Sequence, residues 1–304
     1  FDKAGTFSTV YGRVLSQRWV SSENGYFYRT GSTTTASVNV TSPDANGDQT
    51  VKFSFTKDWP ADSYLPDINY DFTISNNNYY ETFRDGELFY SIDYSPANAD
   101  ITTVAFWNDE DNEFLEGTKY VNQSIHLTDL YGSSGSSGSS GFDQIAFVFG
   151  DPTKSGDMPS TGSANYNVVS QAWLRGDENT EDGYWPTEYY LQGEGVFTAN
   201  FSARTIIGDI DYGYVAKAYD PTSRYIGSSI DNLKFDGTIS GVTFSGDVIW
   251  GNEDFGAEGW FYGGFFGPAA NEIGGVFNMR KIADEGDNSG FWQATGAFTG
   301  CVTC

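Results

Sequence analysis

His126 is the only histidine of the chain, so it decides which catalytic chemistry the sequence can support. A Ser-His-Asp or Cys-His mechanism would have to use this side chain, which lies next to a flexible linker and far in sequence from the cysteines. We interpret His126 as a structural residue and predict no catalytic site. The alternative is an axial ligand of haem iron, because haem proteins commonly use a proximal histidine.

Acidic residues form two polar runs whose spacing would allow two kinds of chemistry. Glycoside hydrolysis needs a pair of carboxyl groups, for which Glu110/Glu113 and Glu178/Glu181 are available. Neither pair falls on strand positions that face a cleft, so we predict solvated loops. Calcium, which takes roughly six to eight oxygen ligands, is the alternative, although the second run lacks the glycine of a complete calcium-binding loop. The candidate calcium ligands are Asp109, Asp111, Glu113, Asp177, Asn179 and Glu181.

The only cysteines are Cys301 and Cys304, close to the end of the sequence. A zinc site would need distant carboxylates in addition to these thiolates and His126. We therefore predict either a local disulfide or pairing between chains. Both fit an oxidising, extracellular setting.

Aromatic residues lie in or beside a predicted long loop over residues 176–188. Trp185, Tyr189 and Tyr190 are the candidate ligand-binding residues of this loop, because exposed aromatic side chains are frequent anchors for a protein partner or a sugar. Core packing is the alternative for each of them.

The composition of the 304-residue chain predicts an all-β protein, in a sandwich or a barrel. Phe 24, Tyr 20 and Trp 8 favour half-buried strands, and Gly 36 with Pro 9 supplies turns. A net charge of −25 argues against a nucleic-acid partner and against docking on anionic lipid. No segment approaches the roughly 18 apolar residues of a membrane span. The first residue is Phe1 and not methionine, which suggests that a leader has been removed or omitted.

Alternating strand patterns divide the sequence into two predicted domains. Residues 1–150 form a small β-rich domain, and residues 151–304 carry about eight strands with mostly short turns. Such a count closes a small barrel whose interior is filled by side chains. Within the first domain, residues 133–141 repeat Ser-Ser-Gly, which is typical of a flexible linker, either natural or an engineered replacement of a loop.

Residues 259–277 predict two strands of a closed antiparallel sheet, joined by a short helical turn. Pro268 suits the first position of this turn. Gly274 and Gly275 are expected to supply the positive φ with which the chain leaves it, and Glu272 is expected to cap it.

The same segment, Gly-Trp-Phe-Tyr-Gly-Gly-Phe-Phe-Gly-Pro-Ala-Ala-Asn-Glu-Ile-Gly-Gly-Val-Phe, resembles the closing hairpin of the barrel in transferrin-binding-protein-B-like bacterial surface proteins. Residues 158–166, Met-Pro-Ser-Thr-Gly-Ser-Ala-Asn-Tyr, resemble the entry to that barrel, and residues 197–210 resemble a third segment of it. Residues 105–107 and 147–150 resemble the last strands of a smaller "handle" domain that precedes the barrel in the family.

The resemblance implies a small β-rich handle followed by an eight-stranded antiparallel barrel, and an extracellular, non-catalytic binding protein. Characterised members of the family capture a host protein such as transferrin, a complement regulator, or haem and haem proteins. Phe1 departs from the lipid-bearing cysteine of the mature lipoproteins, and the Cys301–Cys304 end departs from their glycine-rich basic tail. Variable loops make the contacts in the transferrin-capturing members, so the resemblance assigns no binding residue here.

We therefore predict a secreted bacterial protein, or one on the outer cell surface, that is not an enzyme. Surface loops would bind a protein or a small ligand, and the family analogy points to a host source of iron or haem. The alternative is a structural subunit of an extracellular fibre or surface layer, which would bind copies of itself by strand addition or through its terminal cysteines. Haem and calcium are the only candidate cofactors.

Overall fold

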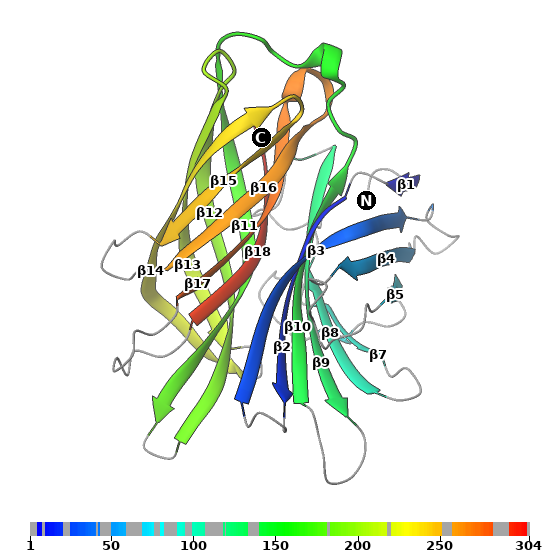
Figure 1. The fold of residues 1–304 in the computed structure, drawn as a ribbon, viewed down its shortest axis with the longest axis vertical. Helices are drawn as coiled ribbons and strands as arrows, with labels where there is room; N and C mark the ends of the chain where they lie inside the picture. Colours follow the sequence, from blue (N-terminus) through cyan, green and yellow to red (C-terminus); the bar gives the residue numbers. More distant parts are fainter. Residues whose placement is uncertain are drawn as a thin grey trace.

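The computed structural model describes residues 5–7, 10–20, 25–40, 42, 50–58, 69–75, 80–81, 90–94, 99–106, 118, 120–132, 140–180, 183–217, 220–250, 257–281 and 292–302. Within these residues the protein is all-β apart from short 3₁₀ turns, which confirms the predicted fold class. The strands form an open sheet and a closed barrel that lie side by side (Figure 1).

An antiparallel sheet contains all the described strands up to Gly150. Its members are β1 (Gly5–Phe7), β2 (Val10–Val20), β3 (Gly25–Val40), β4 (Thr50–Asp58), β5 (Asn69–Ser75), β6 (Tyr80–Glu81), β7 (Tyr90–Tyr94), β8 (Ala99–Phe106), β9 (Val121–Gly132) and β10 (Ser140–Gly150). Their order is β5-β4-β3-β2-β10-β9-β8-β7-β6, with β1 paired to β3, so β2, β10 and β9 lie at the centre.

The Ser/Gly repeat is not a linker over its whole length. Its last two residues, Ser140 and Gly141, belong to β10 and pair with Tyr131 and Leu130 of β9. The apolar residues of β10 must face the buried side of the sheet, and this requirement fixes the register between β9 and β10. Residues 133–139 lie outside the described part of the chain.

The second half of the chain closes into the predicted eight-stranded antiparallel barrel, in which β18 pairs back to β11. Its strands are β11 (Ser163–Thr180), β12 (Gly183–Asn200), β13 (Thr205–Lys217), β14 (Asp220–Ser240), β15 (Thr243–Trp250), β16 (Glu258–Phe266), β17 (Glu272–Lys281) and β18 (Trp292–Cys301). The sheet ends at Gly150 and the barrel begins at Ser163, while the domain limits 1–150 and 151–304 stay a prediction.

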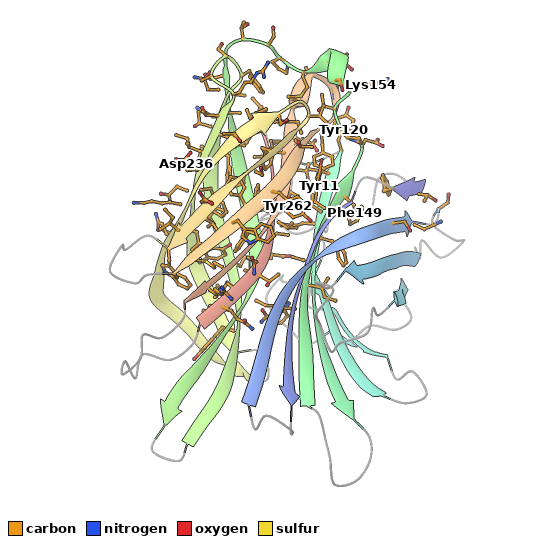
Figure 2. The ribbon with its side chains drawn as sticks, viewed as in Figure 1. Tyr11, Tyr120, Phe149, Lys154, Asp236 and Tyr262 are labelled. Carbon is orange, nitrogen blue, oxygen red and sulfur yellow. The ribbon has the colours of Figure 1, made fainter. Side chains whose placement is uncertain are left out.

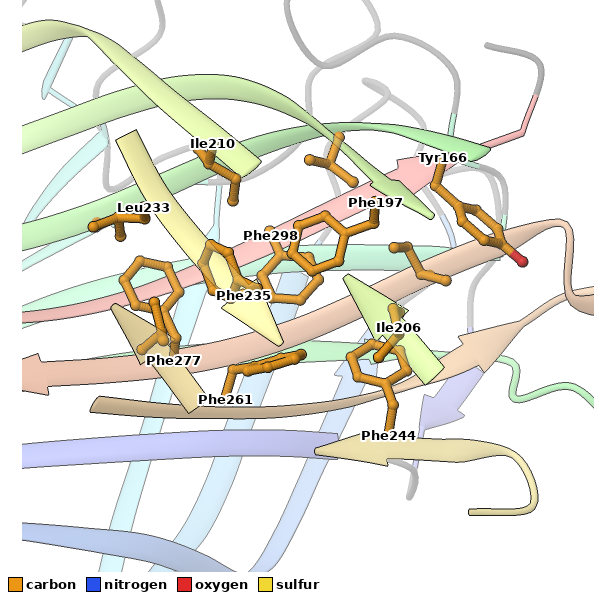
Figure 3. Close-up of a cluster of buried hydrophobic side chains, with 14 of the residues drawn as sticks. Tyr166, Phe197, Ile206, Ile210, Leu233, Phe235, Phe244, Phe261, Phe277 and Phe298 are labelled. Carbon is orange, nitrogen blue, oxygen red and sulfur yellow. The ribbon is translucent and has the colours of Figure 1, made fainter. Parts of the chain in front are cut away.

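Aromatic side chains fill the barrel interior because alternate residues of each strand point inward. The ring centroids of Phe197 and Phe298 lie 4.6 Å apart in a stacked pair. Phe235 packs against Phe197 at 5.0 Å and edge-on against Phe261 at 5.2 Å. Figure 3 shows these rings meeting from several strands of the barrel. They belong to one continuous buried cluster, which is the core of the barrel.

Three buried polar side chains described inside the barrel, those of Tyr166, Ser170 and Tyr212, are hydrogen-bonded. Ser170 Oγ donates to the carbonyl oxygen of Ala297 at 2.9 Å, so the buried Tyr212 hydroxyl is the donor in its 2.7 Å contact with Ser170. Tyr166 donates its hydroxyl proton to the carbonyl oxygen of Ala270 at 2.7 Å. Burial raises the pKa of both tyrosines, so they stay protonated donors.

The closing hairpin has the predicted strands and turn, but its glycines have a different role. The turn η4 (Pro268–Ala270) has Pro268 in its first positions, and the positive φ angles fall on Gly267, Ala269 and Ala270. Gly274 and Gly275 lie in β17 and neither has a positive φ, so the expected positive φ is wrong. Glycine is required here because there is no room for a side chain: a Cβ on Gly274 would come within 2.5 Å of a Val148 methyl carbon.

Candidate functional site

One side of the barrel is covered by the open sheet. The outward side chains Trp173, Phe266, Val276 and Ala297 form a buried cluster with Val121, Ala146 and Val148 of the sheet. We call this side of the barrel, made by the outer faces of β11, β16, β17 and β18, the covered wall. In Figure 1 the sheet strands β2, β9 and β10 lie next to it.

A buried carboxylate joins the covered wall to the sheet. Glu272 Oε2 accepts hydrogen bonds from the backbone N–H groups of Tyr120 and Val121, at 2.8 and 3.0 Å. Glu272 is only 3% exposed. The two bonds to the sheet are a contact that the sequence did not predict, and the expected capping of the turn by Glu272 stays a prediction. Backbone N–H groups at the start of β9 thus supply two hydrogen bonds to this buried carboxylate, and hydrogen bonds to an ionised acceptor are stronger than neutral ones.

A tyrosine pair forms a second link between the sheet and the barrel. The Tyr262 hydroxyl accepts a 2.9 Å hydrogen bond from Gly12 N and donates to the carbonyl oxygen of the same residue. The ring of Tyr11 packs edge-on against that of Tyr262, with centroids 5.7 Å apart (Figure 2). Burial and the neighbouring Tyr262 together raise the pKa of Tyr11 to about 12.

The chain segment between the sheet and the barrel is tied to the closing hairpin. Asp151 N donates to Tyr120 O at 2.8 Å, and Gly267 N donates to Asp151 O at 3.0 Å. Thr153 donates both its backbone N–H and its hydroxyl to residues of the hairpin, Phe265 O and Gly267 O. These bonds fix the closing hairpin against the end of the sheet.

The opposite side of the barrel is exposed. Val196, Ile207 and Ile249 point outward there and are 46%, 55% and 46% exposed. They occupy two neighbouring cross-strand rows, Val196–Asp209–Lys234–Ile249 and Thr198–Ile207–Asp236–Asp247. We call this surface, made by the outer faces of β12 to β15, the open wall. Figure 2 places Asp236 on this side, away from Tyr11 and Tyr262.

The predicted loop over 176–188 is wrong, because this segment is a β-hairpin. Residues 183–188 of β12 pair with residues 175–180 of β11. Among the described residues, 177–180 and 183–188 have no third strand beside them. We call these residues the β11–β12 ribbon, which extends past the neighbouring barrel strands at the lower end of Figure 1. Threonine and aromatic residues in this segment have a high strand propensity, and their cross-strand partners complete the ladder.

The three aromatic candidates therefore lie on a strand and not on a loop. Trp185 is a ribbon residue opposite Glu178. Tyr190 pairs with Trp173 and Ala216 inside the barrel ladder. Tyr189 is partly buried and packs against the barrel core, which is the alternative that the sequence left open for it.

The remaining candidate residues are dispersed. His126 is a β9 residue whose ladder partners are Ile145 and Ala105, in the sheet. Asp177 and Asn179 are strand residues of the ribbon, so this part of the second acidic run is not a loop. Outside the described residues lie Asp109, Asp111, Glu113, Glu181 and Cys304. Cys301, at the end of β18, is disulfide-bonded.

The described side chains contain no cluster of three or more His, Cys, Asp or Glu residues that could hold a metal ion. In the same part of the chain no helix is long and apolar enough to cross a membrane. Haem and calcium therefore stay predictions without a described site.

Sequence reasoning missed Tyr11, Tyr262 and the contact of Glu272 with the sheet. Tyr11 and Tyr262 lie in segments that alternate like any other strand. Nothing in the sequence indicates that segments about 250 positions apart contact each other. Glu272 carried one usable signal: a lone acidic residue at the start of an apolar, glycine-rich strand has to be exposed or paired.

Comparison with known proteins supports the barrel. Residues 158–300 match the family model described as the C-lobe and N-lobe beta barrels of transferrin-binding protein B. No curated protein matches the chain.

Several solved structures resemble the chain weakly. A transferrin binding protein B mutant from Haemophilus parasuis Hp5 has 16% identity and a TM-score of 0.39, covering 90% of this chain and 54% of that one. Intact Ap-TbpB, with N and C lobes, has 13% identity and a TM-score of 0.37, covering 89% and 55%. The isotype 1 protein from serogroup B Neisseria meningitidis has 11% identity and a TM-score of 0.32, covering 98% and 77%.

This chain thus spans about half the length of the first two structures. Structural similarity at this level does not by itself assign a function. The family match coincides with the closed barrel and with all three barrel motifs recognised in the sequence. Residues 158–300 therefore match the barrel family of transferrin-binding protein B in sequence, and the strands within them form a closed eight-stranded barrel.

Proposed function

We propose that this chain is a non-catalytic, extracellular binding protein of a bacterial surface and that it captures a protein partner on its outer surface. The observation that carries the proposal is the filled barrel. An eight-stranded barrel either holds one small ligand or fills its interior with side chains, and here phenylalanine rings pack against one another across the interior. A partner then has to bind to the outer surface of the molecule, where a protein can make enough contacts.

The β11–β12 ribbon is the best candidate for the contact. It projects beyond the barrel on a rigid base, and its segment 183–190 contains the aromatic residues Tyr184, Trp185, Tyr189 and Tyr190. Tryptophan and tyrosine are enriched among the residues that carry most of the binding energy in protein interfaces. Trp185 lies in the part of the ribbon without a third strand, so we assign it the leading contact.

Transferrin is the first partner to test, because the family model and the similar structures are named for transferrin binding. Biolayer interferometry of the protein against immobilised transferrins from several vertebrate hosts, with serum albumin as the negative control, measures this directly. Saturable binding to one transferrin supports the proposal. Absence of binding to all of them, followed by no protein captured from serum, would overturn the assignment of a host protein as the partner.

The ribbon assignment is tested by Trp185→Ala, with Thr187→Ala on the same ribbon as the matched control. Loss of a central tryptophan contact lowers affinity by a factor of about 30 or more, whereas a peripheral threonine changes it by less than about fivefold. Far-UV circular dichroism and unfolding curves establish that both variants keep the fold. Equal affinities for the two variants would place the binding surface elsewhere.

Haem is a second candidate ligand, and His126 is the residue that would bind its iron. Titration with haemin gives a Soret band if a haem site exists, and His126→Ala removes that band if the assignment is right. An unchanged band in the variant excludes His126 as the ligand. Titration with calcium, followed by unfolding temperature, tests the two acidic runs in the same way.

A structural subunit of a fibre or surface layer is the alternative function. No observation on the described residues favours it. Size-exclusion chromatography with multi-angle light scattering, with and without reductant, separates the two functions. Large polymers would exclude capture of a soluble partner by a monomer, and a single monomeric peak would exclude the fibre.

A further inference from the structure

The interface between the sheet and the covered wall contains buried polar side chains that have no hydrogen-bond partner at one or more atoms. The atoms without a partner among the described residues include Gln123 Oε1, Gln144 Oε1 and Nε2, Gln171 Oε1, Gln293 Nε2, Thr295 Oγ1 and Thr299 Oγ1. All six side chains are at most 4% exposed. A folded protein has few such atoms, because each buried polar group without a partner costs about 1–3 kcal/mol.

The strand periodicity places these side chains between the sheet and the barrel. Ala146 and Val148 of β10 pack against Val276 and Ala297 of the barrel. Gln144 precedes Ala146 by two residues and therefore lies on the same face of β10.

The same alternation applies on the other strands. Thr295 and Thr299 flank Ala297 on β18 at a distance of two residues, and Gln171 precedes Trp173 by two on β11. Gln123 follows Val121 by two on β9, and its amide nitrogen reaches across to the carbonyl oxygen of Val169 on β11 at 3.4 Å. The unpaired atoms therefore surround one interface and come from both of its sides.

The unpaired atoms include both hydrogen-bond donors and hydrogen-bond acceptors. The Gln123, Gln144 and Gln171 oxygens are acceptors, the Gln144 and Gln293 nitrogens are donors, and the two threonine hydroxyls can be either. No ionisable group is among them, so the set does not suit a metal ion or a charged ligand. Water, which donates two hydrogen bonds and accepts two, matches a neutral set of this kind.

We propose that ordered water molecules bind between the sheet and the covered wall and bridge these amide and hydroxyl groups. The interface between the sheet and the barrel is then partly apolar, at Trp173, Val276 and Ala297, and partly hydrated, at the glutamines and threonines around them. The water molecules act as part of the packing, because they connect polar groups that do not reach one another directly.

The sign of a stability change tests this proposal. Thr295→Val keeps the shape of the side chain and removes its hydroxyl group. If water binds to that hydroxyl, the variant leaves the water with one partner fewer, and the equilibrium constant for unfolding rises about fivefold. If the interface between the sheet and the covered wall holds no water, the variant removes a buried hydroxyl group without a partner, and the equilibrium constant for unfolding falls.

Thr238→Val is the matched control, because Thr238 is an exposed residue of β14 on the open wall. It reports the effect of the same substitution on an exposed strand, which is subtracted from the result at Thr295. Thr299→Val repeats the test on the other side of Ala297. A fall in the unfolding constant for both buried variants, after subtraction, overturns the proposal.

A crystal structure at about 1.5 Å resolution gives a second, independent readout. The proposal expects ordered water within hydrogen-bond distance of Thr295 Oγ1 and of the Gln144 amide. Direct hydrogen bonds between the glutamine amides and the threonine hydroxyls, with no water between them, would overturn it.

Discussion

The covered wall and the open wall belong to one barrel and follow the same alternation of inward and outward side chains. On the covered wall the outward residues Trp173, Val276 and Ala297 are almost completely buried. On the open wall Val196 and Ile207, which are chemically similar, are about half exposed. The difference does not come from the residues themselves. It comes from the sheet, which packs against one wall and leaves the other in solvent.

The acidic residues of the two walls differ in the same way. Glu272 is buried on the covered wall and accepts two backbone hydrogen bonds from the sheet. Asp236 and Asp247 face solvent on the open wall. One carboxylate therefore stabilises the joint between sheet and barrel, whereas the others contribute to the net charge of −25. Substitutions that are equivalent in sequence should have unequal effects on the two walls.

The largest effect is expected from Glu272→Ala. It leaves the buried N–H of Val121 and the partly buried N–H of Tyr120 without their acceptor, so the free energy of unfolding should fall by about 3–5 kcal/mol. Asp236→Ala on the open wall is the control and should change it by less than about 0.5 kcal/mol. Urea unfolding monitored by tryptophan fluorescence measures both. Equal, small effects would mean that the Glu272 bonds contribute little to the joint.

A smaller loss is expected from Gly274→Ala on the covered wall. The new Cβ would lie 2.5 Å from a Val148 carbon and 2.7 Å from a Val121 carbon, so the sheet has to move away from the barrel. We expect a loss of about 1–3 kcal/mol in unfolding free energy. Gly156→Ala, where a Cβ would meet no atom within 4 Å, is the control. An unchanged stability for Gly274→Ala would show that the two layers are not tightly packed at this point.

Replacement of valine by threonine compares the two walls directly. Val276→Thr buries a hydroxyl group on the covered wall and should lower the unfolding free energy by about 1–3 kcal/mol. Val196→Thr makes the same change on the open wall, where water satisfies the hydroxyl, and should stay within about 0.5 kcal/mol. Thermal unfolding of the two variants side by side is sufficient. If Val196→Thr is the more damaging change, a partner or a second copy covers the open wall.

The smallest effect concerns alkaline pH. The pKa of Tyr11 is raised from 10.0 to about 12 in the folded protein. A raised pKa means that the folded state holds the proton more tightly, so this stabilisation is complete below pH 10 and is lost as the pH rises through 12. Tyr11→Phe should therefore flatten the loss of stability over this range in pH-dependent unfolding. An identical pH profile for the variant would exclude this contribution.

The parts of the fold that depend on local pattern were predictable from the sequence. Alternation with aromatic residues predicted the eight strands of the barrel, and Pro268 predicted the start of the hairpin turn. The errors arose where a distant element decided the outcome. Gly274 was read as a turn residue because nothing in residues 259–277 shows that Val148 packs against it.

The candidate site was less predictable than the fold, for a related reason. The sequence suggests Trp185, Tyr189 and Tyr190 as binding residues of a loop, but whether they lie on a loop or a strand depended on their pairing with β11 and β13. Aromatic residues are compatible with a binding loop, a ribbon and a core, and only their partners distinguish the three. The ribbon contact at Trp185 remains a proposal.

The sequence by itself determined the all-β class, the barrel and its family, because strand periodicity, turn residues and motifs act over a few neighbouring residues. Only the tertiary structure decided which wall of the barrel is covered, what Glu272 binds and why residue 274 is glycine. Those properties depend on contacts between residues that are more than 100 positions apart, such as Glu272 with Tyr120 and Gly12 with Tyr262. Burial and hydrogen-bond partners at this interface arise only when the sheet and the barrel pack together, so they cannot be deduced from either one alone.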